Sequence, residues 1–309
     1  MQINALINAL PGAVSQGLVW GIMAIGLYIT YKVLEVSDLT VDGSIATGAA
    51  VATMLIINGW NVYAAILAAF AAGMLAGLLT GIFHTTLGIP AILAGILTQL
   101  GLYSINLHIM ADQANVSVSV RKYDLLVSSM YVRSFSLDNP LIPLVIMSTV
   151  VILFLYWFFG TEYGCAMRAT GANGNMARAQ GINTNICKVV GLMISNGIVA
   201  VAGALLCQYQ GFSDVKMGQG AIVIGLAAII IAEVLFSKVF RNFALKLVAV
   251  SIGAVIYYLV IQVVLWLGLD TDDLKLLSAL VVALFLGAPY LKGKLAAARL
   301  ASKGGKTNA

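Results

Sequence analysis

Long apolar stretches separated by short polar segments cover most of the chain. A helix that crosses a bilayer needs about 20 mostly apolar residues, because each residue adds about 1.5 Å along the helix axis. The stretches that approach this length predict spans at residues 12–31, 43–59, 61–83, 87–109, 140–160, 186–207, 217–236, 243–267 and 274–290. The pattern therefore predicts an all-α polytopic transmembrane bundle of about nine or ten spans, in one domain that covers residues 1–309.

The composition supports a membrane location. Of the 309 residues 61% are hydrophobic and only 9% are charged, whereas soluble proteins carry roughly 25% charged residues. So few polar side chains cannot cover a surface that faces water, but lipid accepts an apolar exterior. We therefore expect membrane lipid around the chain and no nucleic-acid partner. The first thirty residues lack the features of a removable signal peptide, so we expect them to belong to the mature fold.

Lysine and arginine residues predict the orientation, because cytoplasmic loops carry more of them than external loops. The basic residues gather in loops 161–188 and 237–246 and in the tail 291–309, whereas loops 110–139 and 270–275 are mixed or acidic. This alternation predicts a multi-pass membrane protein with a cytoplasmic C-terminus. The orientation of the N-terminus stays open.

Residues that would form a catalytic or metal site are missing from the sequence. The three cysteines and the two histidines are isolated, and Gly305-Lys-Thr307 has Leu300 where a phosphate-binding loop needs its first glycine. We therefore expect a chain without an ATPase site, a metal or a cofactor of its own. Energy for its activity would come from a partner or from an ion gradient.

The cytoplasmic loop 161–185 is polar and rich in glycine. An alanine-rich stretch predicts a short helix at 174–180, which Asn173 caps at its N-terminus and Gly181 ends in a left-handed conformation. Such a helix could pass a partner's motion to the spans on either side, or it could be an ordinary connector.

This loop resembles a known family. The spacing G-x-x-x-R-A-x-G-x-N-x-x-x-A-x-x-x-G-I-N, from Gly164 to Asn183, is similar to the coupling loop of ABC permeases of the branched-chain amino acid/ribose type. The stretch from Leu39 to Gly48 resembles the second-helix signature of a branch associated with amino acid uptake, notably of aromatic amino acids.

The resemblance implies the permease subunit of an ATP-driven importer with a type II-like fold. It implies a second permease copy in a homodimer, two ATP-binding subunits and an extracytoplasmic substrate-binding protein, with a hydrophobic or aromatic amino acid as substrate. The loop residues that it places against the ATPase are Arg168, Ala169, Gly171, Asn173, Ala177, Gly181 and Ile182. Alternatives are an ABC permease for a nucleoside or sugar, and an ion-coupled secondary transporter.

Polar residues inside the apolar stretches are candidates for the translocation path. They are Thr40, Asp42, Ser44, Thr47, Gln99, Tyr103, Asn106 and Asn196. The first four stand where a broken helix would begin, although Asp42 or Ser44 could simply cap that helix, and Asp38 is expected in a solvated loop. Gln99, Tyr103 and Asn106 share one helix face, where hydrogen bonds between helices are an equal alternative.

Three further features concern the arrangement of helices. The segment 214–225 weakly repeats the pattern of 38–48 from the opposite side of the membrane, as in an inverted repeat. Glu233, the one acid inside an apolar stretch, is expected to reach toward Lys238 or the coupling machinery rather than to act in a proton relay. Gly73, Gly77 and Gly81 form a small-residue stripe that predicts close helix packing.

Overall fold

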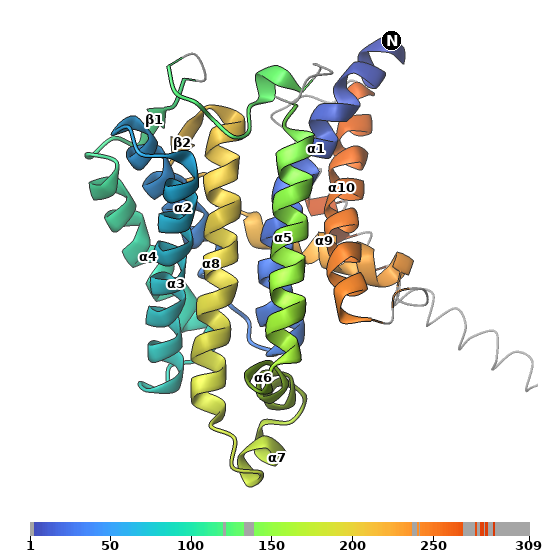
Figure 1. The fold of residues 1–309 in the computed structure, drawn as a ribbon. Helices are drawn as coiled ribbons and strands as arrows, with labels where there is room; N and C mark the ends of the chain where they lie inside the picture. Colours follow the sequence, from blue (N-terminus) through green and yellow to red (C-terminus); the bar gives the residue numbers. More distant parts are fainter. Residues whose placement is uncertain are drawn as a thin grey trace, which may run out of the picture.

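The computed structural model describes residues 3–119, 122–132, 139–236, 240, 242–267, 276, 279–280, 282–283 and 287. The described chain forms a bundle of helices, most of which run side by side (Figure 1). The helices are α1 (Ile3–Tyr28), α2 (Val41–Ile57), α3 (Val62–Thr85), α4 (Ala91–Ile109), α5 (Leu141–Gly160), α6 (Glu162–Ala172), α7 (Gly174–Ala179), α8 (Thr184–Gln210), α9 (Ala221–Phe236) and α10 (Phe243–Trp266). A π-helical turn, η1 (Ile29–Val33), extends α1, and a 3₁₀ turn, η2 (Ser129–Tyr131), precedes α5.

Six helices of the described chain are long and apolar enough to cross a membrane. They cover residues 7–33, 62–85, 91–109, 141–160, 184–210 and 243–266. The predicted spans at 43–59 and 217–236 are shorter than expected, because α2 has 17 residues and α9 has 16. At 1.5 Å per residue both fall below the roughly 30 Å of a hydrocarbon core. The predicted span 274–290 and the tail 291–309 lie almost wholly outside the described residues, so the total of nine or ten spans stays a prediction.

Helix α8 lies at the centre of the bundle, and its residues from Ile194 to Tyr209 are buried. Two predicted small residues of α3 allow this packing. A Cβ atom added at Gly73 would lie 2.3 Å from the carbonyl oxygen of Asn196, and one at Gly77 would lie 2.3 Å from that of Leu192. Since no side chain fits at such distances, the small-residue stripe brings the backbones of α3 and α8 into contact, which confirms its predicted role.

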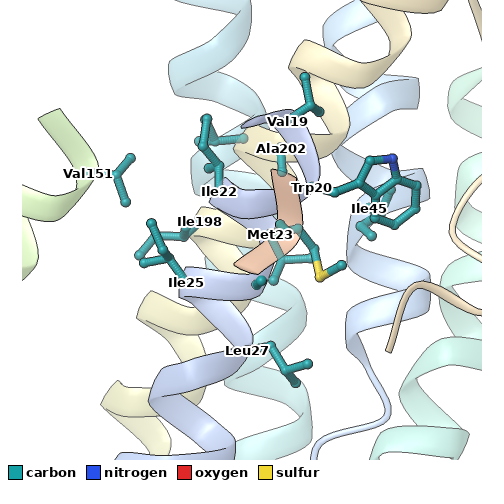
Figure 2. Close-up of a cluster of buried hydrophobic side chains, with 14 of the residues drawn as sticks. Val19, Trp20, Ile22, Met23, Ile25, Leu27, Ile45, Val151, Ile198 and Ala202 are labelled. Carbon is teal, nitrogen blue, oxygen red and sulfur yellow. The ribbon is translucent and has the colours of Figure 1, made fainter. Parts of the chain in front are cut away.

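Apolar side chains from several helices fill the core around α8. Figure 2 shows Ile22 and Ile25 of α1 near Ile198 and Ala202 of α8, with Ile45 of α2 close by. The opposite faces of α3, α4 and α5 remain apolar but exposed, as at Leu67, Leu100 and Leu153, which are 61–69% exposed. This distribution, with large apolar residues both inside and outside, fits a bundle whose surroundings are lipid or other membrane helices.

A small sheet departs from the predicted all-α class. Strand β1 (Asn115–Ser117), after α4, pairs antiparallel with strand β2 (Phe212–Asp214), after α8, and Val116 lies opposite Ser213. Strands of three residues carry too little pattern to be recognised in a sequence. The pairing fastens the two loops that follow α4 and α8.

Candidate functional site

The loop between α5 and α8 forms two short helices that extend beyond one end of the bundle (Figure 1). The hydroxyl of Thr161 accepts a hydrogen bond from the Gly164 amide at 3.3 Å, which caps α6. The side-chain oxygen of Asn173 accepts one from the Met176 amide at 3.0 Å, which caps α7. Gly181 has φ +82°. The predicted helix, its cap and its left-handed glycine are therefore confirmed, whereas the sequence interpretation missed α6.

The seven residues expected to contact an ATPase divide into two groups by their surroundings. Arg168 and Ala169 are exposed on α6 and available to a partner. The others shape the loop itself: Gly171 packs against η1, Asn173 caps α7, Ala177 is 3% exposed, Gly181 makes the turn and Ile182 is half-buried. Contact with a partner stays a prediction; Arg168 and Ala169 are exposed on α6, and Asn173 and Gly181, which also shape the loop, are exposed as well.

Gly171 connects this loop to the end of α1. A Cβ atom at Gly171 would lie 1.9 Å from the carbonyl oxygen of Val33 in η1. Any side chain would therefore push α6 away from η1. At the other end of the loop, Arg178 Nε donates to the Thr184 hydroxyl at 2.8 Å, which fastens α7 to the start of α8. The loop is thus attached to both α1 and α8.

A buried polar network lies where the chain returns from η1 to α2. Asn196, the thirteenth residue of α8, donates to the Asp38 carboxylate at 2.6 Å and accepts from the Ser44 hydroxyl at 2.6 Å. Asp38 also accepts from the Thr40 amide at 2.9 Å. At 1.5 Å per residue, Asn196 lies about 18 Å along α8. The segment 34–40 therefore re-enters the bundle, and the expectation that Asp38 is solvated is wrong: Asp38 is only 4% exposed.

Three threonines extend this polar cluster toward α3 and α4. The hydroxyl of Thr40 is 2.7 Å from that of Thr80, which donates to Thr98 Oγ1 at 2.9 Å. Thr47 instead donates to the carbonyl oxygen of Gly43 within α2. Of the predicted path residues, Thr40, Ser44, Thr47 and Asn196 are at most 3% exposed in the single chain. Hydrogen bonds between and within helices explain these residues, and their exposure to a substrate stays a prediction.

Asp42 makes a contact that the sequence interpretation did not foresee. Its carboxylate accepts hydrogen bonds from the Gly220 amide at 3.0 Å and the Ile222 amide at 3.1 Å. Asp42 therefore caps α9 instead of its own helix. The two short helices α2 and α9 begin beside each other. They begin within the two segments, 38–48 and 214–225, whose sequence patterns weakly resemble each other. No local pattern could reveal this contact, because the partners are about 180 residues apart.

The polar stripe on α4 is divided between two environments. Asn106 is 1% exposed, and its side-chain oxygen accepts no hydrogen bond from the described residues. Gln99 is half-buried and packs near Gly43, while Tyr103 is 43% exposed. The three residues share a helix face as predicted, but only Gln99 and Tyr103 reach the surface of the described chain.

Glu233 forms an ion pair that the sequence interpretation did not name. Its carboxylate lies 2.9 Å from Lys32 Nζ in η1, and the two side chains are 42% and 41% exposed. Lys238, the expected partner, is outside the described residues. The pairing joins the end of α1 to the end of α9, at the same side of the bundle as α6 and α7.

Comparison with known proteins identifies the family. Residues 10–289 match the family described as "Branched-chain amino acid transport system / permease component". The chain belongs to this permease family. The match covers nearly all of the described bundle, so the resemblance inferred from Gly164–Asn183 is confirmed. The permease is an ABC importer subunit that spans the membrane several times, and it is a transport component of a system whose ATPase is a separate subunit.

Relatives of the permease cover most of its length. It is 37% identical over 287 residues to the tyrosine transport system permease protein of Clostridioides difficile, covering 92% of both chains. It is 34% identical to the uncharacterized protein RP368 of Rickettsia prowazekii, covering 91% of this chain and 98% of that one. A more distant relative, the autoinducer 2 import system permease protein LsrC of Yersinia pseudotuberculosis, is 27% identical over 69% of this chain and 58% of its own length.

A solved structure shares the fold. PsaBC from Streptococcus pneumoniae, in complex with Fab, has a TM-score of 0.52 to the permease at 15% identity, and the match covers 95% of this chain and all of that one. At this level of identity the similarity concerns the arrangement of helices alone.

Proposed function

We propose that the permease imports an aromatic amino acid, with tyrosine as the first candidate, using ATP hydrolysed by two partner subunits. The 37% identity to a tyrosine transport permease over 92% of the chain carries this proposal. The resemblance of Leu39–Gly48 to an amino acid uptake branch supports the same substrate class. The distant relative LsrC, an autoinducer 2 import permease, supports a different substrate class more weakly, because it aligns with only 69% of the chain.

The proposed assembly contains a second permease copy and an extracytoplasmic binding protein. The exposed residues Arg168 and Ala169 on α6 support a docking surface for an ATPase at the cytoplasmic side. In this proposal the C-terminus lies in the cytoplasm of a bacterial cell. The two permease copies together form the translocation path. The permease itself binds no cofactor in this proposal, since ATP and Mg²⁺ belong to the ATPase subunits.

Transport assays with purified components test the proposal. Proteoliposomes are prepared with the permease, the ATPase encoded beside it and its binding protein. They should accumulate labelled tyrosine only when ATP is present on the side of the membrane where the ATPase lies. Excess unlabelled phenylalanine or tryptophan should compete, and ribose or uridine should not. Competition by ribose alone would favour the sugar alternative. Uptake that follows a proton or sodium gradient without any ATPase would instead show an ion-coupled transporter.

A further inference from the structure

The short helix α9 is joined at both ends to other helices through carboxylates. At its start, Asp42 of α2 accepts hydrogen bonds from the Gly220 and Ile222 amides. Near its other end, Glu233 forms the 2.9 Å ion pair with Lys32 of η1. Helix α9 therefore connects the beginning of α2, inside the bundle, with the end of α1.

The contact at the start of α9 involves backbone as well as side chain. The first amides of a helix lack partners within it and need an acceptor from elsewhere. Gly220, directly before α9, has φ +87° and no side chain to supply one, so Asp42 fills this need. Gly218 also touches α2, since a Cβ atom there would lie 1.9 Å from the Asp42 carbonyl oxygen. Two kinds of contact thus hold α9 against α2.

The contact at the other end of α9 leads to the cytoplasmic loop. Lys32 precedes Val33, whose carbonyl oxygen meets the backbone of α6 at Gly171. The π-helical turn η1 therefore touches α6 and α9 through neighbouring residues. A displacement of α6 relative to the bundle would move Val33 and Lys32 together, and the ion pair would pass this displacement to Glu233.

We infer that α9 transmits motion of the α6–α7 loop to α2, with Asp42 and the Lys32–Glu233 pair as its positioning residues. This inference rests on the proposed function, because it assumes that an ATPase moves the loop. A helix is stiff along its axis, so a shift at Glu233 also moves the start of α9, where Asp42 accepts from its first amides. The other route, from η1 through segment 34–40 to Asp38 and Asn196, ends on the central helix α8, which is packed on all sides.

The test measures how many tyrosine molecules enter proteoliposomes for each ATP hydrolysed by the complete transporter. Lys32→Glu and Glu233→Lys, each alone, should lower this ratio at least about fivefold, the lower end of typical coupling between sites. The double variant K32E/E233K restores an ion pair and should recover most of the ratio. Asp42→Asn, which keeps the shape but weakens the acceptor, should also lower it. Exposed ion pairs contribute little to stability, so the single variants of the pair should keep the wild-type unfolding temperature.

Asp112→Asn is the matched control. It alters an exposed contact between His108 Nδ1 and the Asp112 carboxylate, also at 2.9 Å, which does not involve α9, so the ratio should stay at the wild-type value. An unchanged ratio in K32E and E233K would overturn the inference, as would a double variant that fails to recover. The double variant leaves Asp42 intact, so its ratio of tyrosine to ATP tests the inference even if D42N folds poorly. If the wild-type protein takes up no tyrosine with ATP, the proposed function fails instead.

Discussion

The network around Asn196 and the α6–α7 loop both provide hydrogen-bond partners for polar groups, but the partners come from different distances along the chain. In the loop, polar groups are satisfied by neighbours in sequence: Asn173 caps a helix that begins at the next residue. In the network, Asp38 and Ser44 are satisfied by Asn196, which is more than 150 residues away. The loop is exposed, so water can replace a lost hydrogen-bond partner. The network is buried, so the loss of one partner lowers the free energy of unfolding. The difference separates a surface loop from a buried contact that holds helices together.

The largest effect on stability is expected from Asn196→Ala. The change removes the Asn196 partner from the buried Ser44 hydroxyl and from the Asp38 carboxylate, which keeps the Thr40 amide, and the two losses together should cost about 3 kcal/mol or more of unfolding free energy. The unfolding temperature of the detergent-solubilised protein should fall sharply. Asn175→Ala, on the exposed surface of α7, is the control and should change little. Equal unfolding temperatures for both variants would show that the network does not stabilise the fold.

Gly77→Ala should have the next largest effect. The added methyl group would meet the Leu192 carbonyl oxygen at 2.3 Å and force α3 away from α8, which should cost about 1–3 kcal/mol. Gly101→Ala on α4 has open space around it and should be neutral or slightly stabilising, because alanine favours helices. Thermal unfolding of the two variants in parallel measures the difference. A smaller decrease in the free energy of unfolding for G77A than for G101A would contradict the close packing of α3 on α8.

Asn173→Ala should weaken only the loop. Loss of the cap should cost about 1 kcal/mol locally, and the bundle should keep its unfolding temperature. Hydrogen exchange of the amides in α7 should become faster, while exchange in α8 should stay the same. If α7 keeps its protection, the 3.0 Å hydrogen bond to the Met176 amide does not hold this helix.

Arg168→Ala should have the smallest effect on stability and a clear effect on transport. Its guanidinium contacts only the Cys165 sulfur, at 3.2 Å, among the hydrogen bonds of the described chain. Exposed substitutions of this kind usually change stability by less than about 0.5 kcal/mol. In the complete transporter, however, ATP hydrolysis should no longer increase with loaded binding protein. Normal stimulation in R168A would remove this residue from the proposed docking surface.

The comparison of the two regions also explains what the sequence could and could not predict. Apolar length located the six long helices, and cap residues located α7, because both signals lie within a few neighbouring positions. The sequence missed α6, whose glycines and polar residues obscure its helical pattern. It placed Asp38 in solvent and did not name Lys32 as a partner of Glu233, since Asn196 and Lys32 reach them only through the folding of distant segments. The contact of Asp42 with α9 could not be predicted for the same reason.

The path residues illustrate a second limit. Ser44 and Asn196 were chosen because polar groups in apolar stretches need partners, and the structure brings these two together. The same pattern cannot tell whether such groups face one another or a substrate. That choice depends on which helix surfaces meet in the folded chain and in its assembly.

The β1–β2 ribbon has a consequence for how the transporter can open. Residues 115–117 and 212–214 are paired across almost a hundred positions of the chain, although β1 begins six residues after the last residue of α4 and β2 two residues after the last residue of α8. Their backbone hydrogen bonds would have to break before the loops that follow α4 and α8 could separate. The ribbon therefore opposes opening of the bundle at this position.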